Sequence, residues 1–133
     1  FFNIFIVQMV RVLVEVKAGR LSLRNKKLVP ESTKGTVYFK ETNPGEYLLE
    51  WFNRESNQTE YSVVIKGQQA EFIRIPNATG RFYYFKFTDR SIKKCFFWLQ
   101  DASTEQDSKI EQIIKDALNT APAPVPAVST PAQ

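Results

Sequence analysis

Most of the chain alternates between apolar and polar residues in the manner of β-strands. Between Arg11 and Lys17, β-branched valines occupy every second position, which is typical of a strand. The pair Ala18-Gly19 interrupts this pattern and residues 21–23 resume it, so we expect a bend or bulge at Gly19 between two extended pieces. Similar runs predict further strands over residues 36–42, 46–53, 59–65, 71–75, 81–87 and 94–100.

Turn-forming residues separate these runs at short intervals. They are Asn25, Pro30 with Gly35, Asn43-Pro44-Gly45, residues 53–57, Lys66-Gly67 and residues 77–80. About seven short strands with this spacing indicate an antiparallel sandwich or barrel.

A helical period appears only after residue 103. Apolar residues at positions 110, 113, 114, 117 and 118 form one face of a helix of roughly 14 residues. Its N-cap is expected from Ser103 with Gln106, or from Thr104 with Asp107. The predicted fold class is therefore all-β with one C-terminal helix: a pleckstrin-homology-like, seven-stranded antiparallel sandwich or barrel capped by an amphipathic α-helix.

The two ends of the chain differ in composition from its middle. Residues 1–10 are nearly all apolar, but a spanning helix needs about 20 such residues, and a signal peptide would begin with positive charge. We interpret them as a leader without a functional role. Residues 119–133 are rich in Pro and Ala and are expected to form a disordered tail. The folded domain is thus predicted over residues 11–118.

The residue inventory argues against an enzyme. The chain contains no His, which removes the commonest general base and metal ligand. The acidic residues show no spacing that would place two carboxylates together on one element. We therefore expect no catalytic residues, no metal and no cofactor. Cys95 is the only cysteine, so no intrachain disulfide can form, and a cytoplasmic and nuclear location is expected.

Several segments together carry a family resemblance. They are residues 13–23 (LVEVKAGRLSL), 34–38 (KGTVY), Trp51, 71–76 (EFIRIP), Gly80-Arg81 and 96–101 (FFWLQD). They resemble the Pru domain, the pleckstrin-like receptor for ubiquitin in the adhesion-regulating-molecule family of proteasome subunits. The Ala-Gly pair after the first strand and the Phe-Phe-Trp-Leu-Gln block are specific in combination, and the resemblance runs from about Leu13 to Leu118.

The resemblance implies a sheet face that docks the extended C-terminal tail of the proteasome's large base scaffold subunit. The matching positions are all apolar: Leu21, Leu23, Leu28, Val29, Pro30, Ile75, Phe82, Phe96 and Trp98. A preformed apolar groove suits a peptide that bears Pro and aromatic residues. For Leu21, Leu23 and Phe96 a role in the protein core explains the residue equally well.

The resemblance also implies loops that bind ubiquitin. By position these correspond to Glu46, Tyr47, Lys66, Gln68, Gln69, Phe87 and Lys94. The middle loop departs from the family, which has a Phe followed by acidic residues where this chain has Lys66 to Gln69. Losing an aromatic anchor at an interface costs about 2 kcal/mol or more. Ubiquitin binding is therefore expected to be weakened, moved onto Glu46, Tyr47 and Phe87, or lost.

Two other functions stay open. One is a phosphoinositide-binding membrane adaptor, because Lys17 to Leu21 and the basic residues up to Lys34 lie where pleckstrin-homology domains hold phosphates. The other is a proteasome-docking adaptor without ubiquitin binding. Nucleic-acid binding is disfavoured, because alternation puts Tyr84 on the opposite strand face from Tyr83 and Phe85. The prediction is a monomeric, non-enzymatic subunit of the proteasome that binds neither nucleic acid nor membranes.

Overall fold

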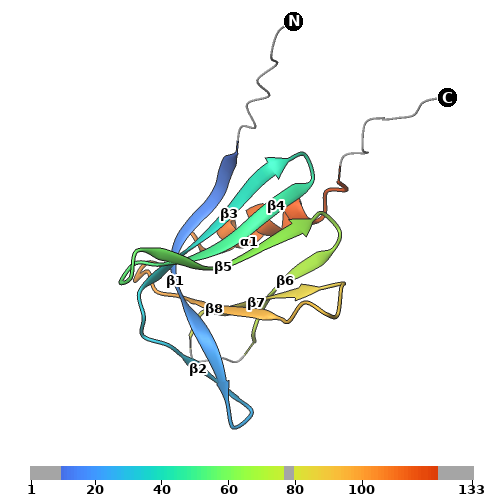
Figure 1. Cartoon of the computed structure of the whole chain (residues 1–133). Coiled ribbons are helices and arrows are strands. Elements are labelled where there is room, and N and C mark those ends of the chain that lie inside the picture. Colours follow the sequence, from blue (N-terminus) through green and yellow to red (C-terminus); the bar gives the residue numbers. More distant parts are fainter. Residues whose placement is uncertain (1–9, 77–79, 123–133) are drawn as a thin grey trace, which may run out of the picture.

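The computed structural model describes residues 10–76 and 80–122, in which eight strands precede one helix (Figure 1). The elements are β1 (Arg11–Arg24), β2 (Lys27–Pro30), β3 (Gly35–Asn43), β4 (Glu46–Asn53), β5 (Gln58–Lys66), β6 (Ala70–Arg74), β7 (Phe82–Phe87), β8 (Cys95–Leu99) and α1 (Asp107–Leu118). Parts of three predicted segments lie outside the described residues: residues 1–9 of the leader, residues 77–79 of the turn and residues 123–133 of the tail.

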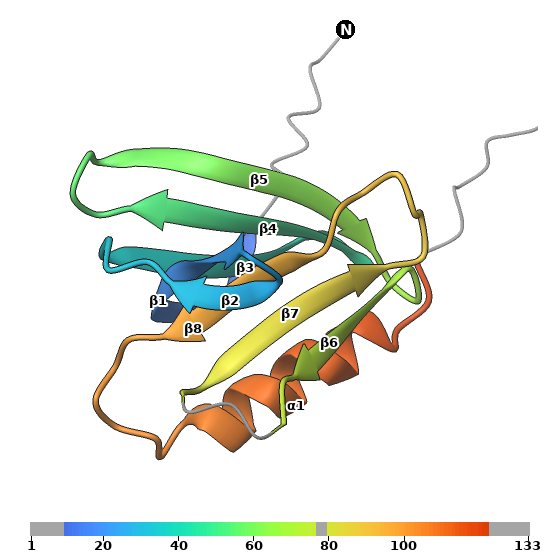
Figure 2. The same cartoon turned by 90° about the horizontal axis from the view of Figure 1, so that it is seen from below.

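The strands form one antiparallel sheet that bends into two layers. Its order is β5-β4-β3-β1-β8-β7-β6, and β2 pairs with β1 beside this path. Figure 2 shows β4 and β5 in one layer and β6 and β7 in the other, with α1 beside β6. The sheet is open, because β5 and β6 are its two edges. The predicted sandwich with one C-terminal helix is confirmed.

Strand β1 belongs to both layers. It pairs with β3 up to Lys17, opposite Thr36, and with β8 from Ala18, opposite Leu99. The predicted interruption at Ala18-Gly19 is therefore a change of pairing partner inside one continuous strand of 14 residues.

The structure has one strand more than the seven or so that the sequence predicts, because the stretch between the predicted turn formers Asn25 and Pro30 contains β2. Lys27–Pro30 pairs with the end of β1 through a two-residue turn at Asn25 and Lys26, both of which have positive φ (49° and 64°). Such a turn matches the twist of a hairpin. The resulting β1–β2 hairpin projects from the body of the domain (Figure 1).

The core lies between the layers and is closed by α1. Alternate residues of β3, β4, β7 and β8 point inward, and Phe39, Leu49 and Phe85 are at most 1% exposed. Ile114 and Leu118 of α1 are buried in the same cluster. Burial of such side chains stabilises the fold by roughly 1.5–3 kcal/mol each. In the part of the chain that the structure describes, no helix is both long and apolar enough to cross a membrane.

The prediction of Ser103 or Thr104 as the N-cap of the helix is wrong. The N-cap residue is Gln106, whose side chain makes no capping hydrogen bond, and α1 spans 12 residues. The hydroxyl of Ser103 instead accepts a hydrogen bond from the Glu105 backbone N–H, at 3.3 Å. The Arg81 guanidinium donates hydrogen bonds to the Asp107 carboxylate and to the Ser103 carbonyl oxygen. A tertiary contact thus replaces the local cap.

Candidate functional site

The sheet layer that contains β6, β7 and β8 has an apolar and aromatic surface on the side that faces away from the core. In β7 and β8 the buried residues Tyr83 and Phe97 alternate with the partly exposed residues Phe82, Phe96 and Trp98. We call this surface the outer face. The residues that define it are Leu21, Leu23, Leu28, Pro30, Ile73, Ile75, Phe82, Tyr84, Phe96 and Trp98.

Trp98 occupies the middle of the outer face. It lies opposite Phe82 on one side and Gly19 on the other. A Cβ atom at position 19 would lie 2.4 Å from the indole Nε1, so only glycine lets the ring lie against β1. The indole N–H donates a hydrogen bond to the Glu31 backbone oxygen, at 3.0 Å. The indole is therefore held in one orientation while part of it stays exposed.

The β1–β2 hairpin extends the outer face. Leu21 lies opposite Pro30, and Leu23 lies opposite Leu28. Paired residues in a sheet share a face, and Leu23 is 71% exposed. Val29 pairs with Ser22 and therefore points to the other side of the hairpin.

At the opposite border of the outer face, Ile75 donates its backbone N–H to the oxygen of Phe82, at 2.9 Å. The structure thus brings all the predicted docking residues onto one face, with the exception of Val29.

Two further residues of the outer face were missed by the sequence analysis. Tyr84 packs against Phe96 with ring centroids 5.2 Å apart, and Ile73 lies opposite Tyr84. The period of two in a strand places Tyr84 on the same side as Phe82. The signal was therefore present in the sequence.

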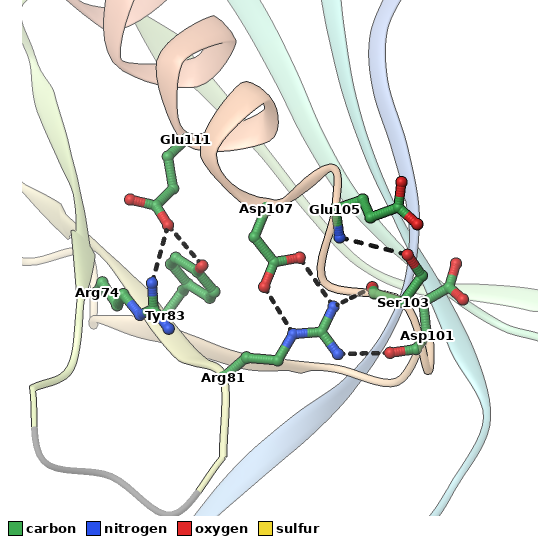
Figure 3. A network of polar contacts seen from close by, with 8 residues as sticks. All are labelled: Arg74, Arg81, Tyr83, Asp101, Ser103, Glu105, Asp107 and Glu111. Atoms are coloured by element: carbon green, nitrogen blue, oxygen red, sulfur yellow. Dashed lines mark hydrogen bonds and ion pairs between the residues drawn. The ribbon is translucent and has the colours of Figure 1, made fainter.

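The helix lies on the other side of this layer, where Arg81 fixes its first turn (Figure 3). The Arg81 guanidinium donates two hydrogen bonds to the Asp107 carboxylate, of 2.7 Å from Nε and 2.8 Å from Nη2. It also donates to the backbone oxygens of Asp101 and Ser103. Paired charge-assisted bonds of this kind are strong and directional.

Glu111 makes the second attachment of α1 to the sheet (Figure 3). Its carboxylate accepts a hydrogen bond of 2.7 Å from the Tyr83 hydroxyl and lies 3.5 Å from Arg74. Burial, together with this bond, raises the pKa of Tyr83. Because both attachments are on the inner side of β7, the helix leaves the outer face uncovered.

The predicted ubiquitin-binding residues gather at one end of the sandwich. Glu46 lies opposite Lys66 where β4 meets β5. The turn after β5 is joined to the turn before β4, because the Gly67 N–H donates to the Gly45 oxygen at 2.8 Å. Gln68 adopts a positive φ of 67° and donates its N–H to the Leu118 oxygen, at 2.6 Å. We call this region the loop end.

Two aromatic members of the predicted ubiquitin set are buried. Tyr47 is 2% exposed and stacks on Phe39 at 5.1 Å, and burial raises the pKa of its hydroxyl. Phe87 is 7% exposed and points inward with the alternate residues of β7. Surface groups remain at Glu46, Lys66 and Lys94 and at the two glutamines. The role of the whole set in ubiquitin binding stays a prediction.

The residues that follow α1 pack over the loop end. A Cβ atom at Gly67 would lie 1.6 Å from the Thr120 oxygen, and one at Gly45 would lie 2.3 Å from the Pro122 Cα. The side-chain amide of Gln68 also donates to the Asn119 oxygen, at 3.4 Å. The packed part of the domain therefore continues past Leu118, through the first residues of the predicted tail.

The described residues show no group of three or more His, Cys, Asp or Glu side chains that could hold a metal ion. Cys95 is buried, and this burial raises the pKa of its thiol to about 12. A thiol with so high a pKa is a poor nucleophile at neutral pH.

A family comparison agrees with this architecture. The model described as proteasome complex subunit Rpn13, Pru domain, matches residues 13–111. The chain belongs to this family. The matched segment begins in β1 and ends inside α1, so it includes the β1–β2 hairpin and the Trp98 strand.

Curated relatives carry the same domain within longer chains. The proteins named proteasomal ubiquitin receptor ADRM1 from Mus musculus and Homo sapiens are each 35% identical over 113 residues, which is 84% of this chain and 28% of theirs. The protein of that name from Danio rerio is 34% identical, over 27% of its length. The chain thus spans little more than a quarter of these relatives.

Proposed function

We propose that this Pru domain is a non-enzymatic subunit module of the proteasome that docks through its outer face and binds ubiquitin at its loop end. The docking partner is the C-terminal tail of the large base scaffold subunit. The domain acts as a monomer in the cytoplasm and nucleus. The relatives named proteasomal ubiquitin receptors support this assignment.

The observation that carries the proposal is the gathering of the predicted docking residues on the outer face. An extended peptide with Pro and aromatic residues finds there the exposed Leu23, the Pro30 ring and the indole of Trp98. The indole is already fixed by its bond to Glu31, so little side-chain entropy is lost on binding. A preformed surface of this kind favours capture of a flexible tail.

Calorimetric titration with a synthetic peptide of the scaffold subunit's C-terminal tail tests whether the domain docks through its outer face. Trp98→Ala should weaken binding by roughly thirtyfold, because a central aromatic anchor contributes about 2 kcal/mol or more. The matched control is Phe52→Ala, a partly exposed aromatic residue on β4 in the other layer, which should leave the affinity unchanged. Equal affinity of wild type and Trp98→Ala would refute docking through the outer face.

The ubiquitin half is supported by the position of the loop end, which leaves charged and amide groups of three loops side by side. An NMR titration of the labelled chain with unlabelled ubiquitin should shift Glu46, residues 66–69 and Lys94. If ubiquitin shifts none of them while the tail peptide still binds, the domain is a docking adaptor without ubiquitin binding.

A further inference from the structure

A cavity of about 630 Å³ lies between β6, β7 and the loop of residues 88–94. Its rim carries four basic side chains, all exposed: Lys86, Arg90, Lys93 and Lys94. Glu71 is the one acidic residue in its lining. All four lie within nine residues of the chain, from Lys86 to Lys94, although only Lys94 is among the residues singled out from the sequence.

Basic side chains outnumber acidic ones around the cavity, where Glu71 lies opposite Lys86 in the pairing of β6 with β7. Among the residues that the structure describes, none of the four basic side chains forms an ion pair. The acidic residue of the same loop, Asp89, accepts hydrogen bonds of 2.9 and 2.7 Å from the N–H and hydroxyl of Ser91. Lys94 lies over the Tyr84 ring, at 5.4 Å. The rim is therefore an exposed cluster that attracts anions.

The lining of the cavity is partly apolar. Phe87 and Ala70 are nearly buried, at 7% and 8% exposure, and Ile92 is partly buried. A volume of this size falls in the range of small-ligand sites, about 300–1,000 Å³, and exceeds what a single carboxylate needs. The site therefore suits several carboxylates combined with an apolar side chain.

We propose that this cavity binds an acidic peptide segment of a partner protein, with carboxylates on the basic rim and an apolar side chain against Phe87 and Ile92. The proposal goes beyond the proposed function. It shares Gln68, Phe87 and Lys94 with the predicted ubiquitin set, but it requires a ligand that carries several carboxylates.

Other polyanions fit the cavity less well. Nucleic-acid bases stack on free aromatic faces, and Tyr84 beside the rim is already in contact with Phe96 and Lys94. A bilayer is a flat surface that would meet exposed side chains, whereas Phe87 and Ala70, which line the cavity, are only 7% and 8% exposed. A flexible acidic peptide can enter the cavity and reach its rim.

The test uses the labelled full chain and a synthetic peptide of glutamates around one phenylalanine. The peptide should shift the amides of Ala70, Glu71 and residues 86–94, and a Gln-for-Glu version should not. Lys86→Glu with Lys93→Glu should weaken binding at least tenfold, because two attractive contacts become repulsive. Binding should also weaken as salt is raised.

The control is the equal reversal of charge on the hairpin, Lys26→Glu with Lys27→Glu, which should change the affinity less than twofold. A milder pair, Lys86→Gln with Lys93→Gln, gives the same readout if the reversed variant does not fold. Equal losses in the rim and hairpin variants would overturn the proposal, as would tighter binding to an oligonucleotide of equal charge or to anionic vesicles. Separate titrations with ubiquitin and the tail peptide keep this result distinct from the proposed function.

Discussion

The indole N–H of Trp51 donates a hydrogen bond of 2.8 Å to the backbone oxygen of Ala18, and both residues are buried. Trp51 belongs to β4, in the layer with β5. Ala18 is the residue at which β1 begins to pair with β8, in the layer with β6 and β7. The same indole fills the space beside Gly35, where a Cβ atom would lie 2.3 Å from it. One side chain thus connects the two layers where they separate.

Trp51→Phe should lower the free energy of unfolding by about 2 kcal/mol, because it leaves a buried carbonyl oxygen without its donor and removes buried ring atoms. Urea denaturation followed by circular dichroism measures the change. The matched control is Trp98→Phe, whose ring is partly exposed on the outer face and should cost less than half as much. Equal losses at the two positions would contradict this role for Trp51.

Arg81→Lys should also destabilise the domain by about 2 kcal/mol, since lysine cannot make the paired bonds to Asp107 and reach two further carbonyl oxygens. The control is Arg11→Lys, because the Arg11–Glu41 pair is on the surface, with the arginine side chain 69% exposed. Exposed pairs contribute about 1 kcal/mol or less. Thermal unfolding of both variants should separate them clearly, and comparable shifts would argue against anchoring of α1 by Arg81.

Alkaline pH should destabilise the domain through two tyrosines, the buried Tyr83 and the partly buried Tyr61. Burial raises the pKa values of Tyr61 and Tyr83 above the ordinary value near 10, so the folded state favours the neutral phenols. Their contribution is fully present below pH 10 and is lost as the pH rises from 10 towards the folded-state pKa values. Chemical denaturation across pH 8–11 should show this decline, and Tyr61→Phe and Tyr83→Phe should each reduce its slope. If the unfolding free energy of both variants falls with pH as steeply as that of the wild type, these two tyrosines are not the cause of the decline.

Gly67→Ala should displace the residues that follow α1, because the added methyl group would lie 1.6 Å from the Thr120 oxygen. We expect a loss of about 1–3 kcal/mol, the usual cost of overpacking. Faster amide exchange at Gln68 should accompany it, since its N–H bonds the Leu118 oxygen. The control is Gln69→Ala, because Gln69 is exposed and directly follows Gln68. This variant should leave the amide exchange of Gln68 unchanged. Wild-type exchange in Gly67→Ala would show that this contact is dispensable.

Much of the strand pattern could be predicted because period-two alternation survives in β7 and β8, where Phe82 and Trp98 face outward between buried neighbours. The strand Lys27–Pro30 could not, because four residues that end in proline carry no alternation to detect. The start of α1 was missed for a different reason. Capping rules consider only neighbours in sequence, and Asp107 is engaged by Arg81, which lies 26 residues away.

The candidate site was predicted as a set of residues, but its geometry was not. The alignment of Gly19, Trp98 and Phe82 in one row depends on the register of three strands, which no single strand encodes. The burial of Tyr47 likewise depends on Phe39 of the neighbouring strand. The basic rim was overlooked although its members all lie between Lys86 and Lys94, because the sequence does not show that this loop and the start of β6 enclose a cavity.

The passage of β1 from one layer to the other has a consequence for folding. Neither layer can detach without breaking the hydrogen bonds of the strand they share, so the domain should melt in a single all-or-none transition with no half-folded species. Native-state exchange would then find the slowest amides in β1 around Lys17 and Ala18, where opening requires the whole molecule to come apart.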